Sequence, residues 1–188
     1  DFNGDGNPDV IARSGNGDLW LYPGNGSGGW LQPIKVGVGW NPISTIVAPG
    51  DFDGDTNVDL LAVLNNRLLL YRGDGAAGWL GKVSYGTGWD AMTALVGPGD
   101  FNGDGSMDLL ARDTTGRMYL YPGDGLGGWL PRSQVGSGWS GMTALAGPGD
   151  FSGDRSVDVM ARNSLGQLLL YRGDGSGGWL LPPWLIGV

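Results

Sequence analysis

The sequence predicts an all-β chain, a β-propeller built from four-stranded antiparallel blades. A nine-residue segment recurs, beginning at Asp1, Asp51, Asp100 and Asp150, so that about four repeats of 49–50 residues fill the 188 residues. Each repeat holds four short apolar runs separated by glycine-rich turns, which is the pattern of propeller blades. With 39 Gly, 11 Pro and no Glu, the composition also disfavours helices.

Each repeat has the same internal order, which the third repeat illustrates. After the nine-residue segment, a first apolar run spans residues 108–112 and a second spans residues 117–122. In the second run, both alternating faces are apolar. This pattern predicts strands whose sheets are covered on both sides. A third strand is expected around 134–135 and an inner strand at 142–146. We interpret the chain as a single repeat domain, 1–188, with units 1–50, 51–99, 100–149 and 150–188.

The first blade is expected to lack its inner strand. The fourth unit stops before its own version of residues 142–146, and no such strand precedes the first nine-residue segment. An unpaired strand edge is a template for association, so self-association or a partner domain is expected to supply the missing strand. A stacked β-helix is the structural alternative, although its coils are usually much shorter than fifty residues.

The nine-residue segments predict calcium sites. Oxygen-bearing side chains fall at positions one, three, five and nine, and the carbonyl of position seven is a further candidate ligand. Ca²⁺ takes about 6–8 such oxygens in proteins, so three to four ions are expected. The candidate ligands are Asp1, Asn3, Asp5, Asn7, Asp9, Asp51, Asp53, Asp55, Asn57, Asp59, Asp100, Asn102, Asp104, Ser106, Asp108, Asp150, Ser152, Asp154, Ser156 and Asp158.

Two other interpretations of these segments were weighed. An EF-hand requires Glu at position twelve and flanking helices, and this chain has Ala there. Metal-free Asx turns would also use Asp, Asn and Gly. Calcium is favoured because three or four carboxylates in each loop would otherwise repel one another. The fourth loop fits least well, since Ser152 and Arg155 depart from the pattern.

The composition restricts the possible functions. The chain has no Cys and no His, which removes disulfides, zinc clusters and Ser–His relays. Thirteen of its nineteen aspartates lie in the four loops, and four Ca²⁺ would neutralise the net charge of −8. A basic footprint for nucleic acid is absent, and no apolar run reaches the ~20 residues of a membrane span. An enzyme is therefore the weakest hypothesis, and calcium sites of this kind favour a secreted protein.

The segment Asp100–Arg112 resembles the FG-GAP/VCBS-like repeat, and the resemblance extends over nearly the whole chain. The Gly-Gly-Trp and Gly-Trp-x-x-Met-Thr-Ala-Leu segments are similar to the variety appended to secreted actinobacterial hydrolases. The resemblance implies a β-propeller with calcium in the loop after each inner strand, as in integrin α-subunit heads and some lectins. It implies ligands at the Asp and Asn positions named above.

Repeated side chains outside the loops suggest further roles. A tryptophan ends each glycine-rich turn and could stack on sugar rings, although burial between blades is the favoured interpretation for each. These candidate ligand-binding residues are Trp30, Trp79, Trp129 and Trp179. A core position is expected for Trp40, Trp89 and Trp139. The repeated arginines Arg13, Arg112 and Arg162 are expected to form ion pairs with loop carboxylates. A structural role in the turns is expected for Asp74, Asp124 and Asp174.

The sequence thus favours a secreted, calcium-binding propeller that binds carbohydrate in a lectin-like manner, with glycans as partners. Two alternatives stay open. One is a protein-interaction or assembly scaffold that a partner chain completes. The other is a non-catalytic accessory fragment of a larger secreted hydrolase.

Overall fold

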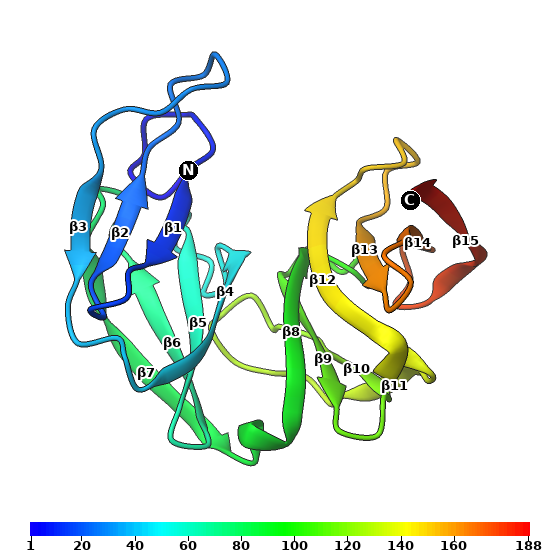
Figure 1. The fold of residues 1–188 in the computed structure, drawn as a ribbon. Coiled ribbons are helices and arrows are strands. Elements are labelled where there is room, and N and C mark those ends of the chain that lie inside the picture. Colours follow the sequence, from blue (N-terminus) through cyan, green and yellow to red (C-terminus); the bar gives the residue numbers. More distant parts are fainter. The chain divides into compact units, whose positions relative to one another are not determined.

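The computed structural model describes residues 1–188 and contains four antiparallel sheets, one for each repeat (Figure 1). The first sheet has three strands in the order β1-β2-β3 and the second has four in the order β4-β5-β6-β7. Their bounds are β1 Val10–Arg13, β2 Leu19–Tyr22, β3 Ile34–Gly37, β4 Ile43–Gly50, β5 Asp59–Leu64, β6 Arg67–Gly73 and β7 Trp79–Thr87.

The third and fourth sheets repeat the four-stranded order. The short 3-10 turns η1 (Trp89–Ala91) and η2 (Trp139–Gly141) precede their inner strands, β8 and β12. The bounds are β8 Met92–Gly99, β9 Asp108–Asp113, β10 Met118–Tyr121, β11 Ser133–Gly136, β12 Met142–Gly149, β13 Asp158–Asn163, β14 Leu168–Gly173 and β15 Trp179–Gly187. The prediction of one antiparallel sheet per repeat is confirmed.

The chain divides into two compact units. The first contains Asp1–Asp51 and Asp55–Trp89, and therefore the first two sheets. The second contains Phe52–Gly54 and Asp90–Val188, and therefore the third and fourth sheets. No helix of the structure has the length and hydropathy that crossing a membrane would require.

In the first unit, one apolar cluster joins the two sheets. Leu19 of the first sheet packs there with Ile43, Leu60 and Ala62 of the second sheet. Trp40, which lies between the last strand of the first sheet and the first strand of the second, belongs to the same cluster. Strand β5 is buried along nearly its whole length, on both faces. In the neighbouring β6, Leu68, Leu69 and Leu70 are buried as well, which confirms for this sheet the expected cover on both sides, whereas β2 and β10 alternate between buried and half-buried residues.

The second unit has an equivalent cluster between its two sheets. Phe101, Leu110 and Met118 are fully buried there, together with Trp139 and Val159. The predicted core position of Trp40, Trp89 and Trp139 is confirmed, since these side chains are 6%, 9% and 4% exposed.

The first sheet lacks an inner strand, as predicted. In the second sheet, β4 fills this place and pairs with β5 from Ile43↔Leu64 to Gly50↔Asp59. Strand β1 has only β2 as a partner. Val10 at the start of β1 is 45% exposed, whereas its counterparts are at most 1% exposed; they are Leu60, Leu109 and Val159.

We expect Leu61→Ala to lower the free energy of unfolding by about 2–5 kcal/mol, because the fully buried side chain would leave a cavity in β5. Leu80→Ala is the matched control, since Leu80 in β7 is 58% exposed and its loss should cost no more than about 0.5 kcal/mol. Urea unfolding of both variants measures the difference. Equal losses would show that β5 is not a core strand.

Candidate functional site

The second, third and fourth nine-residue loops each connect an inner strand to the next strand of the same sheet, and each is closed by its last aspartate. In the third loop, Asp108 at the start of β9 pairs with Gly99 at the end of β8. Asp59, Asp108 and Asp158 are completely buried. The loop is thus anchored at the sheet, while its middle residues lie at the surface.

The aspartates at positions one and nine organise the loop by accepting backbone hydrogen bonds. Asp100 accepts from the N–H groups of Gly103 and Asp104 at one oxygen, and from Gly105 at the other, over 2.7–3.1 Å. Asp108 accepts from Phe101 and Asn102 at 2.9 and 3.1 Å. A third bond to Asp108, from Gly123 at 3.1 Å, ties the loop to the hairpin turn of its own sheet.

These hydrogen bonds form the Asx-type turns that the metal-free interpretation expects, and they leave acceptor positions on the carboxylates free for a cation. A carboxylate has about four acceptor positions on its two oxygens, so an oxygen that accepts one N–H can still coordinate an ion. The structure therefore realises the turn geometry without excluding the calcium interpretation.

The charge of Asp108 is poorly compensated by the protein alone. Burial raises the pKa of Asp108 to about 6, although three N–H groups donate to the carboxylate, and nearby Asp104 adds to the increase. By contrast, the Asn3 side chain and the Asn7 N–H lower the pKa of the exposed Asp5 by hydrogen bonding. A divalent cation beside Asp108 would favour its charged form, as nearby opposite charges do.

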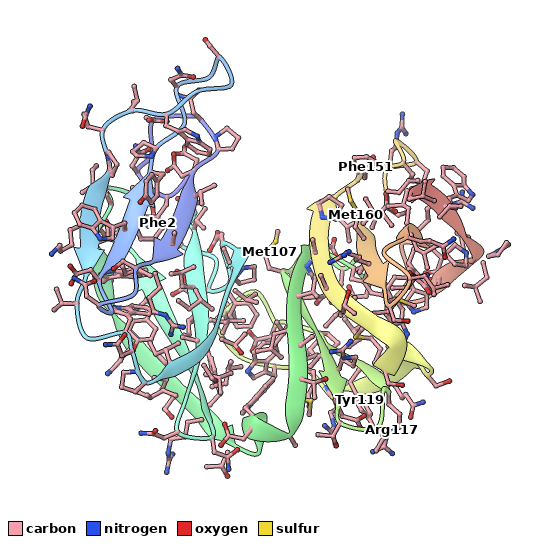
Figure 2. The ribbon with its side chains drawn as sticks, in the orientation of Figure 1. Phe2, Met107, Arg117, Tyr119, Phe151 and Met160 are labelled. Carbon is pink, nitrogen blue, oxygen red and sulfur yellow. The ribbon has the colours of Figure 1, made fainter.

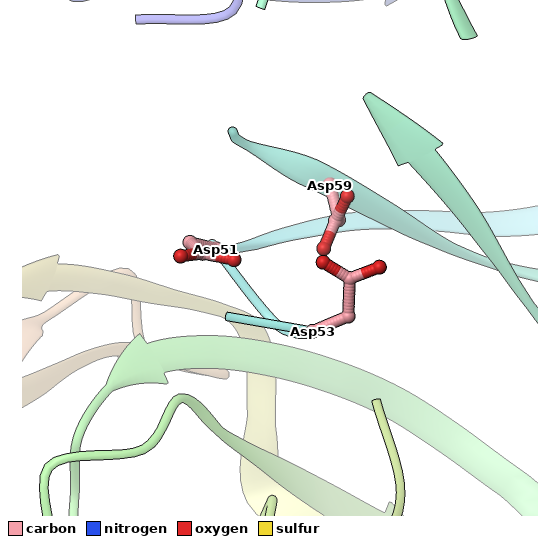
Figure 3. A group of neighbouring side chains, drawn as sticks. All are labelled: Asp51, Asp53 and Asp59. Atoms are coloured by element: carbon pink, nitrogen blue, oxygen red, sulfur yellow. The ribbon is translucent and has the colours of Figure 1, made fainter. Parts of the chain in front are cut away.

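Two further observations test whether the loops fit Ca²⁺. In the second loop, one oxygen from each of Asp51, Asp53 and Asp59 lies within 4.8 Å of the other two, and Figure 3 shows the Asp53 and Asp59 carboxylates facing each other. Ligands bound at about 2.3–2.6 Å can be up to roughly 5 Å apart, so this spacing fits one ion. In the fourth loop, Ser152 Oγ and Asp158 Oδ1 are buried without a hydrogen-bond partner, at positions three and nine. The donor set of the second loop therefore fits the ion, and the fourth loop offers two oxygens for one.

The loops also make a repeated contact with the glycine-rich turn of the following repeat, which we call the loop–turn contact. Position two of the loop is always Phe, and its ring packs on the tryptophan that ends the turn. The ring centroids are 4.6–4.8 Å apart in the pairs Phe2–Trp79, Phe52–Trp129 and Phe101–Trp179.

The backbones approach closely at this contact, which requires glycine. A Cβ on Gly103, which has φ +78°, would lie 2.4 Å from the carbonyl oxygen of Gly175. Gly4 and Gly54 stand at the same distance from the carbonyl oxygens of Gly75 and Gly125. Any side chain at position four would therefore push the loop and the turn apart.

The predicted tryptophan sites fall into two environments. Trp79 and Trp179 are half-buried, and their indole N–H groups donate to the carbonyls of Val36 and Val135 at 2.7 and 2.8 Å. Trp129 is half-buried as well. Trp30 differs, because it is 59% exposed. Trp30 is thus the one of the four indoles with most of its surface open to a ligand.

The repeated aspartates of the turns have the structural role predicted for them. Asp74 accepts from the N–H groups of Ala76 and Gly78 at 2.8 and 2.7 Å, and Asp124 and Asp174 accept in the same way.

The prediction of ion pairs between the repeated arginines and the loop carboxylates is wrong for Arg13 and Arg112. Each guanidinium donates instead to two backbone carbonyls at the start of the next sheet's inner strand, which for Arg112 are those of Trp139 and Met142. The carbonyls of Trp40 and Trp139 also accept the N–H groups of Ile43 and Met142, so the arginine adds a second bond at this bend.

The first unit contains a cavity of about 340 Å³ that sequence reasoning did not identify as a site. Its walls include Trp40, Tyr71 and Trp79, with ring centroids 4.6–6.0 Å apart. Lys82 lies at its rim, with Nζ 5.6 Å from the centroid of Tyr71. Burial raises the pKa of Tyr71, which keeps its hydroxyl neutral and able to donate. The sequence signal was weak, because these residues belong to two different repeats.

A family model supports the repeat assignment. The FG-GAP-like repeat matches residues 1–62, 64–111 and 100–161. The chain belongs to the FG-GAP-like repeat family. No curated protein matches its sequence.

Two solved lectin structures share the fold of this FG-GAP-like chain. One is an Agrocybe aegerita lectin that specifically recognises non-reducing terminal N-acetylglucosamine, with a TM-score of 0.65 at 16% identity. The other is the BP39L lectin from Burkholderia pseudomallei, with a TM-score of 0.59 at 18% identity. Both matches cover all of this chain but only 50% and 53% of the lectins, so the chain spans about half of their length. The likeness confirms the β-propeller fold.

We expect Gly103→Ala to destabilise the protein more than Gly105→Ala. Both glycines have positive φ, so both substitutions incur backbone strain of about 1–3 kcal/mol. Only Gly103 faces a backbone oxygen, whereas an added Cβ on Gly105 meets nothing within 4 Å. The difference between the two unfolding free energies measures the loop–turn contact. If the two variants have the same stability, the close approach of Gly103 to Gly175 does not exist in solution.

Proposed function

We propose that this chain is a calcium-binding β-propeller module that binds carbohydrate and acts outside the cell. The observation that carries the proposal is the aromatic cavity with a rim lysine in the first unit, on a fold shared with two lectins. Its volume of about 340 Å³ lies in the range of about 300–1,000 Å³ that is usual for small-molecule sites.

The chemistry of the cavity suits a sugar ring. The apolar faces of Trp40 and Trp79 can pack against sugar C–H groups, and the Tyr71 hydroxyl and the Lys82 ammonium can hydrogen-bond to sugar hydroxyls or to an N-acetyl oxygen. Lys82 is well suited to this role because it is exposed and makes only a cation–π contact, with Tyr71. The same site offers no pair of carboxylates in different environments for glycoside hydrolysis, which favours binding over catalysis.

In this proposal, the oxygen ligands at positions one, three, five, seven and nine of each loop hold Ca²⁺. The support comes from the spacing of Asp51, Asp53 and Asp59, the unpartnered oxygens of Ser152 and Asp158, and the raised pKa of Asp108. The ion would supply charge neutralisation and hold each loop in the shape that makes the loop–turn contact. Filling such sites requires calcium at extracellular concentrations, from which we infer that the module is secreted.

A second candidate function is an assembly scaffold, which the exposed edge of β1 favours. Strand β1 pairs only with β2, and Val10 is exposed there, whereas its counterparts Leu60 and Val159 pack in the apolar cluster with the preceding sheet. This role is compatible with sugar binding, since the edge of β1 and the lining of the cavity involve different residues.

We expect EDTA to lower the melting temperature of the protein by several degrees at pH 7, because an ion that binds only the folded state stabilises it by mass action. Differential scanning calorimetry in CaCl₂, in MgCl₂ and in EDTA measures the shift, with magnesium as the control cation. An unchanged melting temperature in EDTA would contradict the calcium proposal.

We expect the increase in melting temperature that calcium causes to be larger at pH 7 than at pH 5. The folded-state pKa of Asp108, about 6, lies above the unfolded value near 3.8. In metal-free protein, the stability that this group contributes is therefore full below about pH 4 and is lost as the pH rises through about 6. A bound ion requires the charged carboxylate, so calcium reverses this trend. A calcium effect that is equal at pH 5 and pH 7 would exclude Asp108 as a ligand.

We expect Lys82→Gln to weaken the binding of N-acetylglucosamine roughly tenfold, because a hydrogen bond to a charged group is lost. Isothermal titration calorimetry in CaCl₂ measures the affinity. Lys35→Gln is the matched control, since Lys35 pairs with Asp18 at 2.6 Å and does not line the cavity. Equal affinity for both variants would place the sugar elsewhere, and failure to bind any sugar on a glycan array would contradict the function itself.

A further inference from the structure

The aromatic cavity of the first unit is lined by one positive charge, that of Lys82, and by no negative charge. None of the residues that form its walls is an aspartate, although the chain contains 19 of them and has a net charge of −8. Binding sites carry charge complementary to that of their ligands, because unlike charges attract and like charges repel. The lining of this cavity therefore favours a ligand with a negative charge.

The Lys82 ammonium is positioned by the sheet and keeps its hydrogen-bond donors available. Lys82 in β7 lies directly opposite Tyr71 in β6, so the two side chains project from the same face of the sheet. Its Nζ is 5.6 Å from the centroid of the Tyr71 ring, and this cation–π contact is its only charged interaction. Such a contact uses the charge of the ammonium but does not engage its three N–H groups as donors to oxygen. A ligand in the cavity can therefore accept from Lys82.

A second cation that lies over an aromatic ring shows how Lys82 differs. The Arg117 guanidinium lies 5.6 Å from the centroid of the Tyr119 ring, and Figure 2 shows these two side chains next to each other. Arg117 also forms an ion pair with Asp113 at 2.7 Å, so its charge is already neutralised within the protein. Lys82 has no such acidic partner, and its charge remains available to a ligand.

The side chains of the cavity supply hydrogen-bond donors and few acceptors. The indoles of Trp40 and Trp79 and the ammonium of Lys82 can only donate. The Val36 carbonyl already accepts the Trp79 indole N–H at 2.7 Å. The Tyr71 hydroxyl can donate as well, because burial raises its pKa and keeps it neutral. A sugar hydroxyl brings a proton that needs an acceptor, whereas a carboxylate only accepts, so a carboxylate matches this set of donors better.

We propose that the cavity selects an acidic sugar, a hexuronic acid whose ring packs against Trp40 and Trp79 and whose carboxylate binds Lys82 and the Tyr71 hydroxyl. The proposal rests on the sugar-binding function proposed above and names the class of sugar that this site takes. The aromatic rings supply packing that any hexose would receive. The carboxylate supplies the discrimination, because a hydrogen bond between two charged groups is roughly twice as strong as a neutral one.

The second unit repeats the three rings of the cavity without the lysine. Trp139, Tyr171 and Trp179 have ring centroids 4.3–6.0 Å apart, and burial raises the pKa of Tyr171 as well. The third residue after Trp179 is Pro182, whereas Lys82 is the third residue after the tryptophan of the first unit's cavity. The acidic sugar is therefore expected to bind once per chain, in the first unit.

Isothermal titration calorimetry with methyl β-D-glucuronide and with its methyl ester tests the proposal. The two ligands share one sugar ring and differ in the methyl group that removes the charge of the ester. Wild-type protein in CaCl₂ should bind the glucuronide at least about tenfold more tightly than the ester, with one site per chain. The preference should shrink as NaCl is raised from about 0.05 to about 0.5 M, because salt screens the charge of an exposed ammonium.

Two pairs of variants locate the carboxylate. Lys82→Gln should bring the glucuronide-to-ester affinity ratio close to one and keep the wild-type melting temperature, because Lys82 is exposed. Lys35→Gln should keep the tenfold preference, since Lys35 is paired with Asp18 and does not line the cavity. Tyr71→Phe should weaken the glucuronide several-fold by removing a donor, whereas Tyr171→Phe, the same change in the second unit, should leave the affinity unchanged.

The failure of this proposal is distinguishable from the failure of the sugar-binding function. A wild-type protein that binds the ester as tightly as the glucuronide, or a preference that survives Lys82→Gln, would overturn the choice of an acidic sugar while sugar binding stands. Two glucuronide sites per chain would show that the three rings suffice without the lysine, which also overturns it. Failure to bind the glucuronide, the ester and N-acetylglucosamine would overturn both proposals.

Discussion

The loop–turn contact is the constraint on which the rest of this structure depends. It combines an aromatic pair, such as Phe101 on Trp179, with a backbone approach that only glycine allows at Gly103. Both parts require the loop to hold one shape, and aspartates provide that shape by accepting its N–H groups. Within each unit, the loop–turn contact therefore acts together with the apolar cluster between the sheets to fix neighbouring repeats against each other.

The same aspartates create an electrostatic problem that the proposed Ca²⁺ would resolve. Asp108 is completely buried beside other carboxylates, and three N–H donors do not offset the cost of burying its charge. Neutral Asn at every position would fold the turns without this cost, because Asn25 makes the same turn bonds as Asp74. The retention of charged residues in the loops, but not in every turn, is the physical reason to assign the ion to the loops.

The repeat made much of the fold predictable from the sequence, whereas the contacts between repeats could not be predicted from it. The period, the strand order and the missing inner strand of the first sheet all follow from comparing one repeat with the next, as Val10 with Leu60. The partners of Arg112 did not follow, because a guanidinium beside acidic loops suggests an ion pair, whereas the structure provides two carbonyls at the start of the next sheet's inner strand. The aromatic cavity was missed for a similar reason. Trp40 and Tyr71 are 31 positions apart in different repeats, and neither stands out from its own repeated counterparts.

A repeat protein gives each position several copies, so the positions where copies differ carry information of their own. Tyr71 and Trp79 recur in every repeat and build the walls between sheets, but the third residue after the tryptophan is Lys82 in one repeat and Pro33, Arg132 or Pro182 in the others. Constant residues are those that the fold requires in every blade, and they cannot by themselves distinguish one blade from another. The variable third residue, Lys82 beside the cavity of the first unit, is what distinguishes this blade from the others.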